Sequence, residues 1–397
     1  MATILPFKAV RPTRDKVGLF ATRTYLSYSK EGLKEKLINN PYTFLQIINP
    51  DFHETNKSKG KKKLDLIKKK FQSFIQKKII LKDSQEALYI YSLNHENKEY
   101  KGIIATTLTD EYGNKTIKKH EKTIKKRVEL FTEYLYNVNF NADPVLLSYK
   151  SNEKINQIIE SLSSTRPEYE FSTSNMALHK LWMITKNKDI LKITEEFKKI
   201  NSLYIADGHH RSASSYRLSK NNGPNYFMSF LLDEKQINIY SFNRIIKNVD
   251  INLDKFLQKI SNSFKLKEIS KLEFQSENEN EILVYFNNTF LSIIPKEKIN
   301  SGNILSKLSY SILNDKILKD ILNLDFNKQD IQYQNGKIKN EEIIEIINRE
   351  KKAIGFILKP IKIDVIKKIA DENLTLPPKS TYIEPKLRSG ITILDLK

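Results

Sequence analysis

The chain has 397 residues, 39% of them hydrophobic, which is enough to bury a core and predicts two or three structural units. It has no run of about 18 apolar residues, which excludes a membrane-spanning helix, and a proline and charges follow its first residues too early for a signal peptide. The absence of cysteine excludes disulfides, thiolate metal sites and a cysteine nucleophile. We therefore expect a soluble cytoplasmic protein.

The net charge of +20 is compatible with nucleic-acid binding, because lysine and arginine neutralise phosphates. Lysine, isoleucine and asparagine are frequent throughout the chain, however, and the basic runs do not alternate with aromatic residues. Lysine also outnumbers arginine, whereas bidentate contacts to bases and phosphates favour arginine. We interpret the charge mainly as a solvated surface, with nucleic-acid binding as the lesser alternative.

The predicted elements of the first part of the chain alternate between helices and short strands. Amphipathic spacing predicts the helices, and runs of β-branched and aromatic residues predict the strands. In chain order they are a helix at 31–38, a strand at 42–48, a helix from residue 64, a hairpin of strands 87–93 and 102–107, a helix at 118–137 and a strand at 144–149.

The rest of the chain continues this alternation. The predicted elements are a strand at 178–185, a helix at 189–200, a strand at 203–206, a helix at 211–220, a second hairpin at 225–232 and 237–246, a helix at 253–264, strands within 281–294, helices at 303–322 and 341–351, a strand at 353–358 and a helix at 365–372. Hairpins with intervening helices predict an α+β fold with mixed sheets. We expect an N-terminal α+β region at 1–140, a central region at 141–248 and a C-terminal α/β region at 249–397.

The strongest chemical signal is the segment 207–211, Asp-Gly-His-His-Arg, which joins a short apolar strand to a helix. Glycine lets the backbone approach a ligand closely, and the start of a helix offers unpaired N–H groups and a positive dipole end to a phosphate. A tight turn with an aspartate cap is the structural alternative. A run of polar residues after a buried strand favours function. The candidate catalytic residues are Asp207, His209, His210 and Arg211, with Gly208 and Ser212 as candidate phosphate-binding residues.

A second candidate cluster lies at 117–127. A helix there would place His120, Thr123 and Arg127 on one face, because residues at this spacing align along a helix. Glu121 lies off that face unless the helix begins after it, and no HExxH motif is present, so zinc-protease chemistry is not implied. A charged helix surface is an equally good interpretation.

The segment 376–390 is the third candidate. Its prolines predict an ordered, extended loop, in which Lys379, Ser380 and Thr381 could together bind a phosphate. The glycines of a Walker loop are missing, and a proline-stiffened surface segment is the alternative. Elsewhere, we interpret His179 and Trp182 as core residues.

Six segments, in order, form a recognisable set. They are residues 6–12, residues 40–45, the pattern I-x-x-H-E-x-T at 117–123, H-x-L-W at 179–182, I-A-D-G-H-H-R at 205–211, and P-x-K-S-T-Y-x-x-P-K-x-x-x-G within 376–390. Together they resemble the uncharacterised DUF1015 family. Many members of that family also carry P-P-Y-D-V after the opening, whereas residues 21–28 of this chain contain no aspartate.

The loop at 207–211 further resembles the D-G-H-x-R loop of ParB/sulfiredoxin-like proteins, which include free L-serine kinases that use ATP or ADP. The resemblance implies a ParB/sulfiredoxin-like core at 141–248 and a kinase of a small hydroxyl metabolite, most concretely serine to O-phosphoserine. Phosphates would lie on the loop, with Mg²⁺ bridging them. It implies that His120, Arg127, Lys379, Ser380 and Thr381 are further phosphate-binding residues, and that Glu121 and Asp207 are candidate bases.

Two other functions would use the same residues. A ParB-like nucleic-acid-binding protein or nuclease would place the loop on a phosphodiester, and its binding would weaken steeply with salt. A metal-dependent hydrolase would need a converging set of side chains, for which the sequence offers His120, His209, His210, Asp207 and Glu121. The phosphate donor, the acceptor, any metal ligands and the oligomeric state are left open by the sequence.

Overall fold

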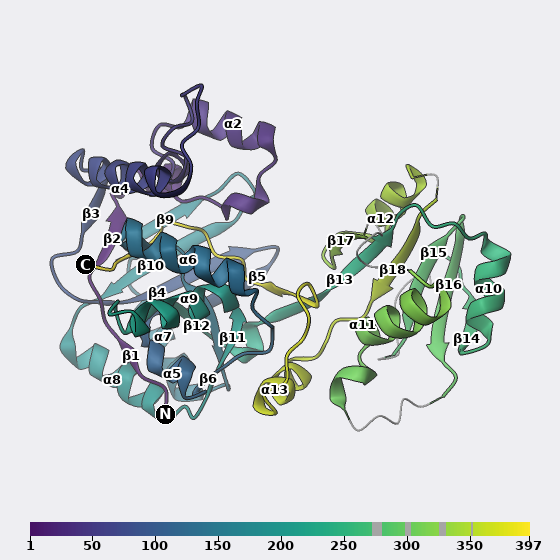
Figure 1. Cartoon of the computed structure of the whole chain (residues 1–397). Helices are drawn as coiled ribbons and strands as arrows, with labels where there is room; N and C mark the ends of the chain where they lie inside the picture. The colour runs from purple at the N-terminus through teal and green to yellow at the C-terminus, as the bar shows by residue number, and fades with distance from the viewer. Residues whose placement is uncertain (272–279, 298–302, 325–330, 351) are drawn as a thin grey trace. The chain divides into compact units, whose positions relative to one another are not determined.

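The computed structural model describes residues 1–271, 280–297, 303–324, 331–350 and 352–397. The chain forms two compact units, and Figure 1 labels many of their helices and strands. Unit 1 comprises residues 1–237 and 385–397, and unit 2 comprises residues 238–384. Unit 2 is therefore an insertion in the sequence of unit 1.

Unit 1 is built on a nine-stranded mixed sheet, all of whose strands lie in described residues. β12 runs parallel to β8 and antiparallel to β5, and β11 runs antiparallel to β8. The strand order is β6 (Ile117–Lys118), β11 (Leu203–Asp207), β8 (Val145–Tyr149), β12 (Tyr226–Asp233), β5 (Lys98–Leu108), β4 (Leu88–His95), β10 (Leu178–Ile184) and β9 (Tyr169–Ser172), with β1 (Ile4–Leu5) paired to β5.

A smaller sheet of unit 1 joins segments that are far apart in the sequence. Its order is β3 (Ile80–Lys82), β2 (Ala9–Pro12), β20 (Ile393–Asp395) and β7 (Phe140–Asn141). β20 follows unit 2 in the chain, and it pairs antiparallel with both β2 and β7. This pairing fixes the segment 385–397 to unit 1.

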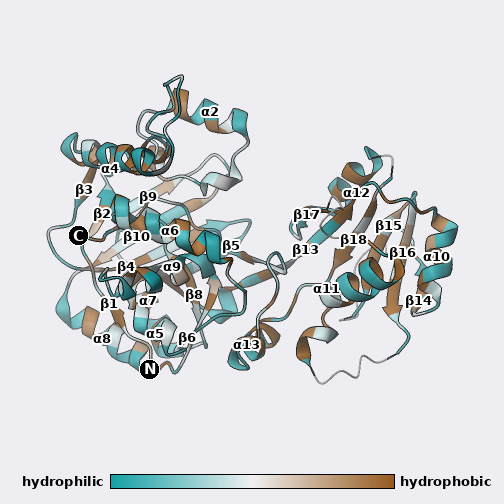
Figure 2. Ribbon diagram, viewed as in Figure 1, coloured by the Kyte–Doolittle hydropathy of each residue, from teal (hydrophilic) through white to brown (hydrophobic). Residues whose placement is uncertain are grey.

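The helices of unit 1 cover these sheets, and Figure 2 shows hydrophobic residues concentrated along the strands. Side chains of α7 and α8 form one apolar cluster with β4, β5, β8 and β11, while α6 packs against α4 and α9. The lysine-rich α4 buries Ile67, Phe71 and Phe74, so its lysines form a solvated face. The helices are α1 (Val17–Phe20), η1 (Tyr25–Ser27), α2 (Lys30–Asn39), α3 (Leu45–Ile48), α4 (Gly60–Gln76), α5 (Thr109–Gly113), α6 (Lys125–Val138), α7 (Glu153–Ser163), α8 (Asn187–Lys198), α9 (His209–Lys220) and η2 (Glu234–Gln236).

Unit 2 has its own sheet and apolar core. Its described strands follow the order β14 (Phe264–Glu268), β16 (Thr289–Pro295), β15 (Ile282–Phe286), β18 (Ile354–Leu358), β13 (Asn238–Ile246) and β17 (Ile331–Asn335), with β19 (Thr381–Glu384) on β13. Its described helices are α10 (Leu253–Ser261), η3 (Ile304–Lys307), α11 (Ser309–Ser311), the π-helix η4 (Ile312–Ile321), α12 (Asn340–Asn348) and α13 (Ile363–Asp371). In the pairing of β13 with β19, Asn238 lies opposite Glu384.

The predicted α+β class is confirmed, as is the hairpin of β4 and β5. Three predictions are wrong, of which one, the start of the helix at 118–137, is described with the site. Residues 42–48 contain helix α3 instead of a strand, because a short apolar run buried on several sides has no diagnostic period. The second predicted hairpin does not form: β12 lies between β5 and β8 in unit 1, whereas β13 pairs with β17, β18 and β19 in unit 2.

Residues 1–140 and 141–237 contribute strands to the same sheet of unit 1, whereas residues 238–248, the end of the second predicted region, belong to unit 2. The three-part division and the ParB/sulfiredoxin-like core remain predictions. Residue 351, at the end of one predicted helix, lies outside the described residues. Among the described residues, no helix combines the length and apolar character needed to cross a bilayer.

Candidate functional site

The connection between β11 and α9 forms the loop that the sequence singles out. Gly208 is the N-cap of α9 and has φ +102°, a backbone conformation that favours glycine. A Cβ atom on Gly208 would lie 3.1 Å from the Arg211 guanidinium. No side chain caps α9, so its first N–H groups are not satisfied by a capping hydroxyl or carboxylate. This helix start therefore has the features of an anion-binding turn.

Asp207 forms ion pairs with two cations. Its Oδ2 lies 2.5 Å from Arg211 Nη2, and its Oδ1 lies 2.6 Å from Lys386 Nζ. Burial raises the pKa of Asp207, but the charges of Lys386 and Arg211 outweigh burial and hold it well below its ordinary value. Asp207 is therefore a carboxylate that orients two cations, and it is poorly suited to accept a proton.

A pair of buried histidines lies at the same loop. The rings of His120 and His209 have their centroids 4.5 Å apart and are nearly perpendicular. Both side chains are buried, and within the described residues neither Nε2 atom has a hydrogen-bond partner. Leaving a buried polar atom unpaired costs about 1–3 kcal/mol. Two such atoms beside an uncapped helix start indicate that a polar ligand or water completes the site.

Burial keeps both histidines neutral at pH 7. It lowers the pKa of His120 from 6.5 to about 4, and it lowers the pKa of His209 well below 6.5, with a further contribution from His120. Neutral imidazoles can each offer one N–H donor or one lone pair at Nε2. His120 donates through its other ring nitrogen to the Ile205 backbone carbonyl, so in the neutral form its Nε2 offers a lone pair to a donor such as a hydroxyl or water. Of the two rings, His209 is the one that could donate to a phosphate oxygen without adding charge.

The buried His120 makes folding sensitive to acid. Because the pKa of His120 is lower in the folded state than its ordinary 6.5, the unfolded chain takes up the proton first as the pH falls. Stability from this histidine is present above pH 6.5 and is lost between pH 6.5 and about 4. We expect His120→Asn to remove on the order of 3 kcal/mol of this pH dependence.

Urea unfolding at pH 7 and pH 4 measures this effect as the difference between wild type and variant. The matched control is His53→Asn, at an exposed histidine, which should keep the wild-type dependence. An unchanged pH dependence in the His120 variant would show that this ring does not titrate as a buried group.

The segment before α6 differs from the predicted helix at 118–137. β6 occupies residues 117–118, and α6 begins only at Lys125, so His120, Thr123 and Arg127 do not share a helix face. His120 nevertheless reaches the loop, and His210 Nε2 accepts a hydrogen bond from the Ile124 backbone N–H at 3.0 Å. Burial and then the charge of Arg127 lower the pKa of His210. The chain before Lys125 is therefore not helical, and it brings His120 and Ile124 of the second candidate cluster to the loop at 207–211.

The other predicted residues divide between the two units. Ser212 is buried in the first turn of α9, where its hydroxyl donates to the Gly208 carbonyl at 3.1 Å. In unit 2, Ser380 Oγ donates to the Pro377 carbonyl, and Lys379 Nζ lies 4.9 Å from the centre of the Phe242 ring. Thr381 begins β19. Phosphate binding by the three unit 2 residues remains a prediction, as does the role of the half-buried Glu121.

Lys386 is the residue of this site that the sequence analysis missed. It lies in the closing P-K pair of the motif at 376–390, but we assigned the phosphate role in that motif to Lys379. The one sequence feature that could have indicated Lys386 is its place after Pro385 in this motif.

His179 is a core residue, as predicted: its Nδ1 lies 2.7 Å from the Tyr91 hydroxyl, and its ring stacks on Phe171.

The metal-hydrolase hypothesis required five side chains to converge. In the part of the chain that the structure describes, no three histidine, aspartate or glutamate side chains form a group that could hold a metal ion. Asp207 is instead held by Lys386 and Arg211. The geometry favours binding of an anion over binding of a metal by protein ligands alone.

Fold and site together define an α+β protein with a cationic and histidine-lined loop between a buried strand and a helix. The chain belongs to the family described as "Protein of unknown function (DUF1015)", whose family model matches residues 4–318. No curated protein matches the chain significantly.

Solved structures with detectable similarity include a mutant free serine kinase in complex with ADP, at 15% identity and a TM-score of 0.42, covering 77% of this chain and 95% of that one. A conserved hypothetical protein from Pyrococcus furiosus has 15% identity and a TM-score of 0.38, covering 74% and 95%. SbnI with a C-terminal truncation, from Staphylococcus aureus, has 11% identity and a TM-score of 0.39, covering 72% and 87%.

Proposed function

We propose that this protein is a phosphotransferase that uses ATP or ADP with Mg²⁺ to phosphorylate a hydroxyl group of a small metabolite. Free L-serine, giving O-phosphoserine, is the most concrete acceptor that the loop resemblance implies. The observation that carries the proposal is the uncapped start of α9 beside two buried, unpartnered Nε2 atoms, those of His120 and His209. An anion would satisfy the first N–H groups of α9, and a hydroxyl or water bound beside it could donate to the Nε2 lone pair of His120.

The residues of the loop fit the phosphates of a nucleotide. Gly208 leaves room for phosphate oxygens at the backbone N–H groups of α9, because a side chain there would meet Arg211. Arg211 and Lys386 supply positive charge, and Asp207 holds both in place. Ser212, His210 and Arg127 lie around the same turn. Phosphoryl transfer depends mainly on such positioning and on charge stabilisation.

Mg²⁺ fits this site as an ion held chiefly by the phosphates. It prefers oxygen ligands and commonly uses one or two carboxylates together with substrate phosphates. When bound, it would neutralise charge on the transferred group. The carboxylate at the loop, Asp207, is already paired with two cations, so its own task is to position them.

The test is to incubate purified full-length protein with ATP or ADP, Mg²⁺ and a pool of free amino acids and related hydroxyl compounds. Phosphorylated products are read by mass spectrometry, and nucleotide binding is measured by calorimetry. A phosphorylated product supports the proposal. Absence of both nucleotide binding and transfer contradicts it, and salt-dependent binding of nucleic acid would then be measured next.

A further inference from the structure

A cavity of about 370 Å³ lies in unit 1 beside the loop. Arg211 and Ser214 of α9 line it, as do residues of α3, α4 and α6. This volume is within the range of about 300–1,000 Å³ that is typical of small-molecule sites. Most of its wall is apolar, including Phe44, Ile48, Leu64, Ile67, Phe131 and Leu135.

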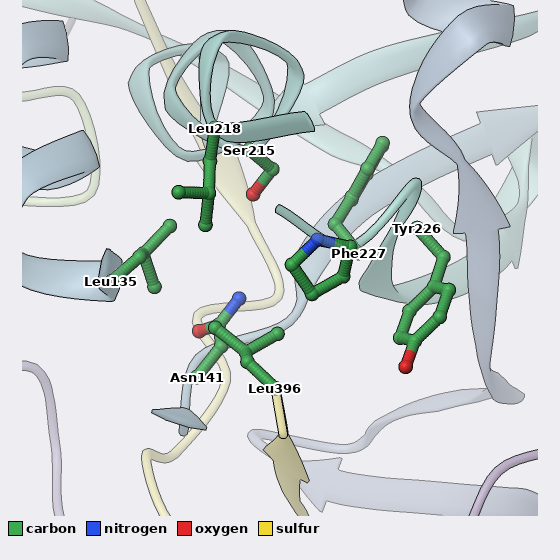
Figure 3. Close-up of a pocket in the computed structure, with 8 residues that line it drawn as sticks. Leu135, Asn141, Ser215, Leu218, Tyr226, Phe227 and Leu396 are labelled. Atoms are coloured by element: carbon green, nitrogen blue, oxygen red, sulfur yellow. The ribbon is translucent and has the colours of Figure 1, made fainter. Parts of the chain in front are cut away.

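The cavity is bounded on one side by Leu135 and Asn141. Both residues also line a second, much smaller pocket, shown in Figure 3, which leaves no room for a water molecule. In Figure 3, Leu218 and Leu396 approach these two residues from α9 and from the chain end after β20. Leu135 and Asn141 are therefore closely packed on the side that faces away from the larger cavity.

One part of the cavity wall is polar and contains an aspartate that the sequence analysis did not select. Asp143 Oδ1 accepts a hydrogen bond from Ser389 Oγ at 2.5 Å. Among the described residues, Asp143 Oδ2 has no hydrogen-bond partner and the side chain has no ion pair. Asp143 is thus a carboxylate that Ser389 orients through one oxygen. It lies near Tyr134 of the same cavity wall, where burial and then the charge of Asp143 raise the pKa of the tyrosine.

Arg211 connects this cavity to the loop. Its Nη2 pairs with Asp207, and its Nη1 donates to the backbone carbonyl of Pro144, the residue after Asp143. The same guanidinium thus contacts the loop on one side and the chain next to Asp143 on the other, while the residue lines the cavity. A phosphate on the loop and a molecule in the cavity would both lie near Arg211.

We propose that this cavity binds the hydroxyl-bearing acceptor and that Asp143 is its general base, an inference that rests on the proposed function. This inference replaces serine, which only the loop resemblance implies, with an acceptor that has an apolar or aromatic part, because serine would leave most of the apolar wall uncovered. In the reaction, the acceptor oxygen forms a bond to the terminal phosphorus of ATP or ADP. The bond from that phosphorus to the bridging oxygen breaks, its electrons leave with ADP or AMP, and the hydroxyl proton passes to Asp143 Oδ2.

Binding and transfer are measured separately, with 2-phenylethanol as an aromatic hydroxyl probe and L-serine as a small one. Ligand-observed NMR on the full chain is expected to detect 2-phenylethanol on wild type. Leu64→Trp, which fills the cavity, should abolish that signal, whereas Leu130→Trp, at an exposed position on α6, should keep it. Ile48→Trp repeats the test from another wall if the first variant does not fold.

Transfer is measured with Asp143→Asn, against Asp110→Asn at an exposed aspartate as control. Loss of a positioned base should lower the transfer rate by about 10²- to 10⁴-fold while ADP binding stays unchanged. The wild type should also phosphorylate 2-phenylethanol in preference to serine. Asp143→Asn with wild-type transfer would overturn the role of the base.

The outcomes separate this inference from the proposed function. If 2-phenylethanol does not bind wild type, or still binds the filled variants, the cavity is not the acceptor site even where transfer to serine occurs. If wild type neither binds nucleotide nor transfers phosphate, the proposed function fails and the role of Asp143 fails with it. Probe binding that Leu64→Trp abolishes would then still support a small-molecule site in the cavity.

Discussion

Arg211→Ala is expected to lower phosphoryl transfer by about 10³-fold or more, the scale on which arginine stabilises transferring phosphoryl groups. The substitution removes the guanidinium that pairs with Asp207 and that donates to the Pro144 carbonyl. It also leaves Asp207 with Lys386 as its remaining cation in the described site. Single-turnover transfer, measured with saturating nucleotide, isolates the loss in the chemical step from any loss in binding.

Arg217→Ala is the matched control, because Arg217 lies on the same helix but is half exposed and pairs with Glu129. This variant should retain transfer within a few-fold of wild type, as an exposed ion pair contributes only about 0–1 kcal/mol. If Arg211→Ala and Arg217→Ala lowered phosphoryl transfer equally, Arg211 would contribute to the stability of α9 and would have no specific part in the reaction. Melting temperatures of both variants check that neither is unfolded.

Gly208→Ala is expected to weaken ADP binding about ten-fold or more, since strain of about 1–3 kcal/mol accompanies a side chain in this backbone region. At φ +102° any side chain is disfavoured, and the new Cβ would lie 3.1 Å from the guanidinium of Arg211. The turn would relax away from the shape that exposes the first N–H groups of α9. Calorimetric titration with ADP measures the change in affinity.

Gly18→Ala provides the comparison, because a Cβ there would meet Phe171 at an ordinary 3.7 Å. That variant should bind ADP as wild type does. Undiminished affinity in Gly208→Ala would show that the turn at the start of α9 does not hold the phosphates.

The loop at 207–211 could be predicted because its signal is local. A buried strand, a glycine and a helix start follow one another in the sequence, and polar residues fill the junction. His120 was also selected, but in the wrong element: the charged residues before α6 fit a helical pattern, while the chain is extended until Lys125. The local sequence pattern therefore identified His120 correctly but predicted the wrong backbone conformation for the segment that contains it.

The residues that were missed interact across long separations in the chain. Lys386 pairs with Asp207 from beyond unit 2, and Ser389 orients Asp143 in the same way. Nothing in the sequence near Asp143 indicates a distant serine. The same reason explains the wrong second hairpin, since alternation along β12 and β13 predicts strands without saying which strand each will pair with.

Asn238 and Glu384, the first and last residues of unit 2, are direct partners in an antiparallel pair. Opposite residues in such a pair have Cα atoms only about 4.5–5.5 Å apart. Their covalent neighbours, Ile237 and Pro385, can therefore be joined by a short glycine linker that replaces the whole insertion. A shortened gene could therefore encode unit 1 alone. Lys386 and Ser389 would then remain in the same chain as the loop at 207–211.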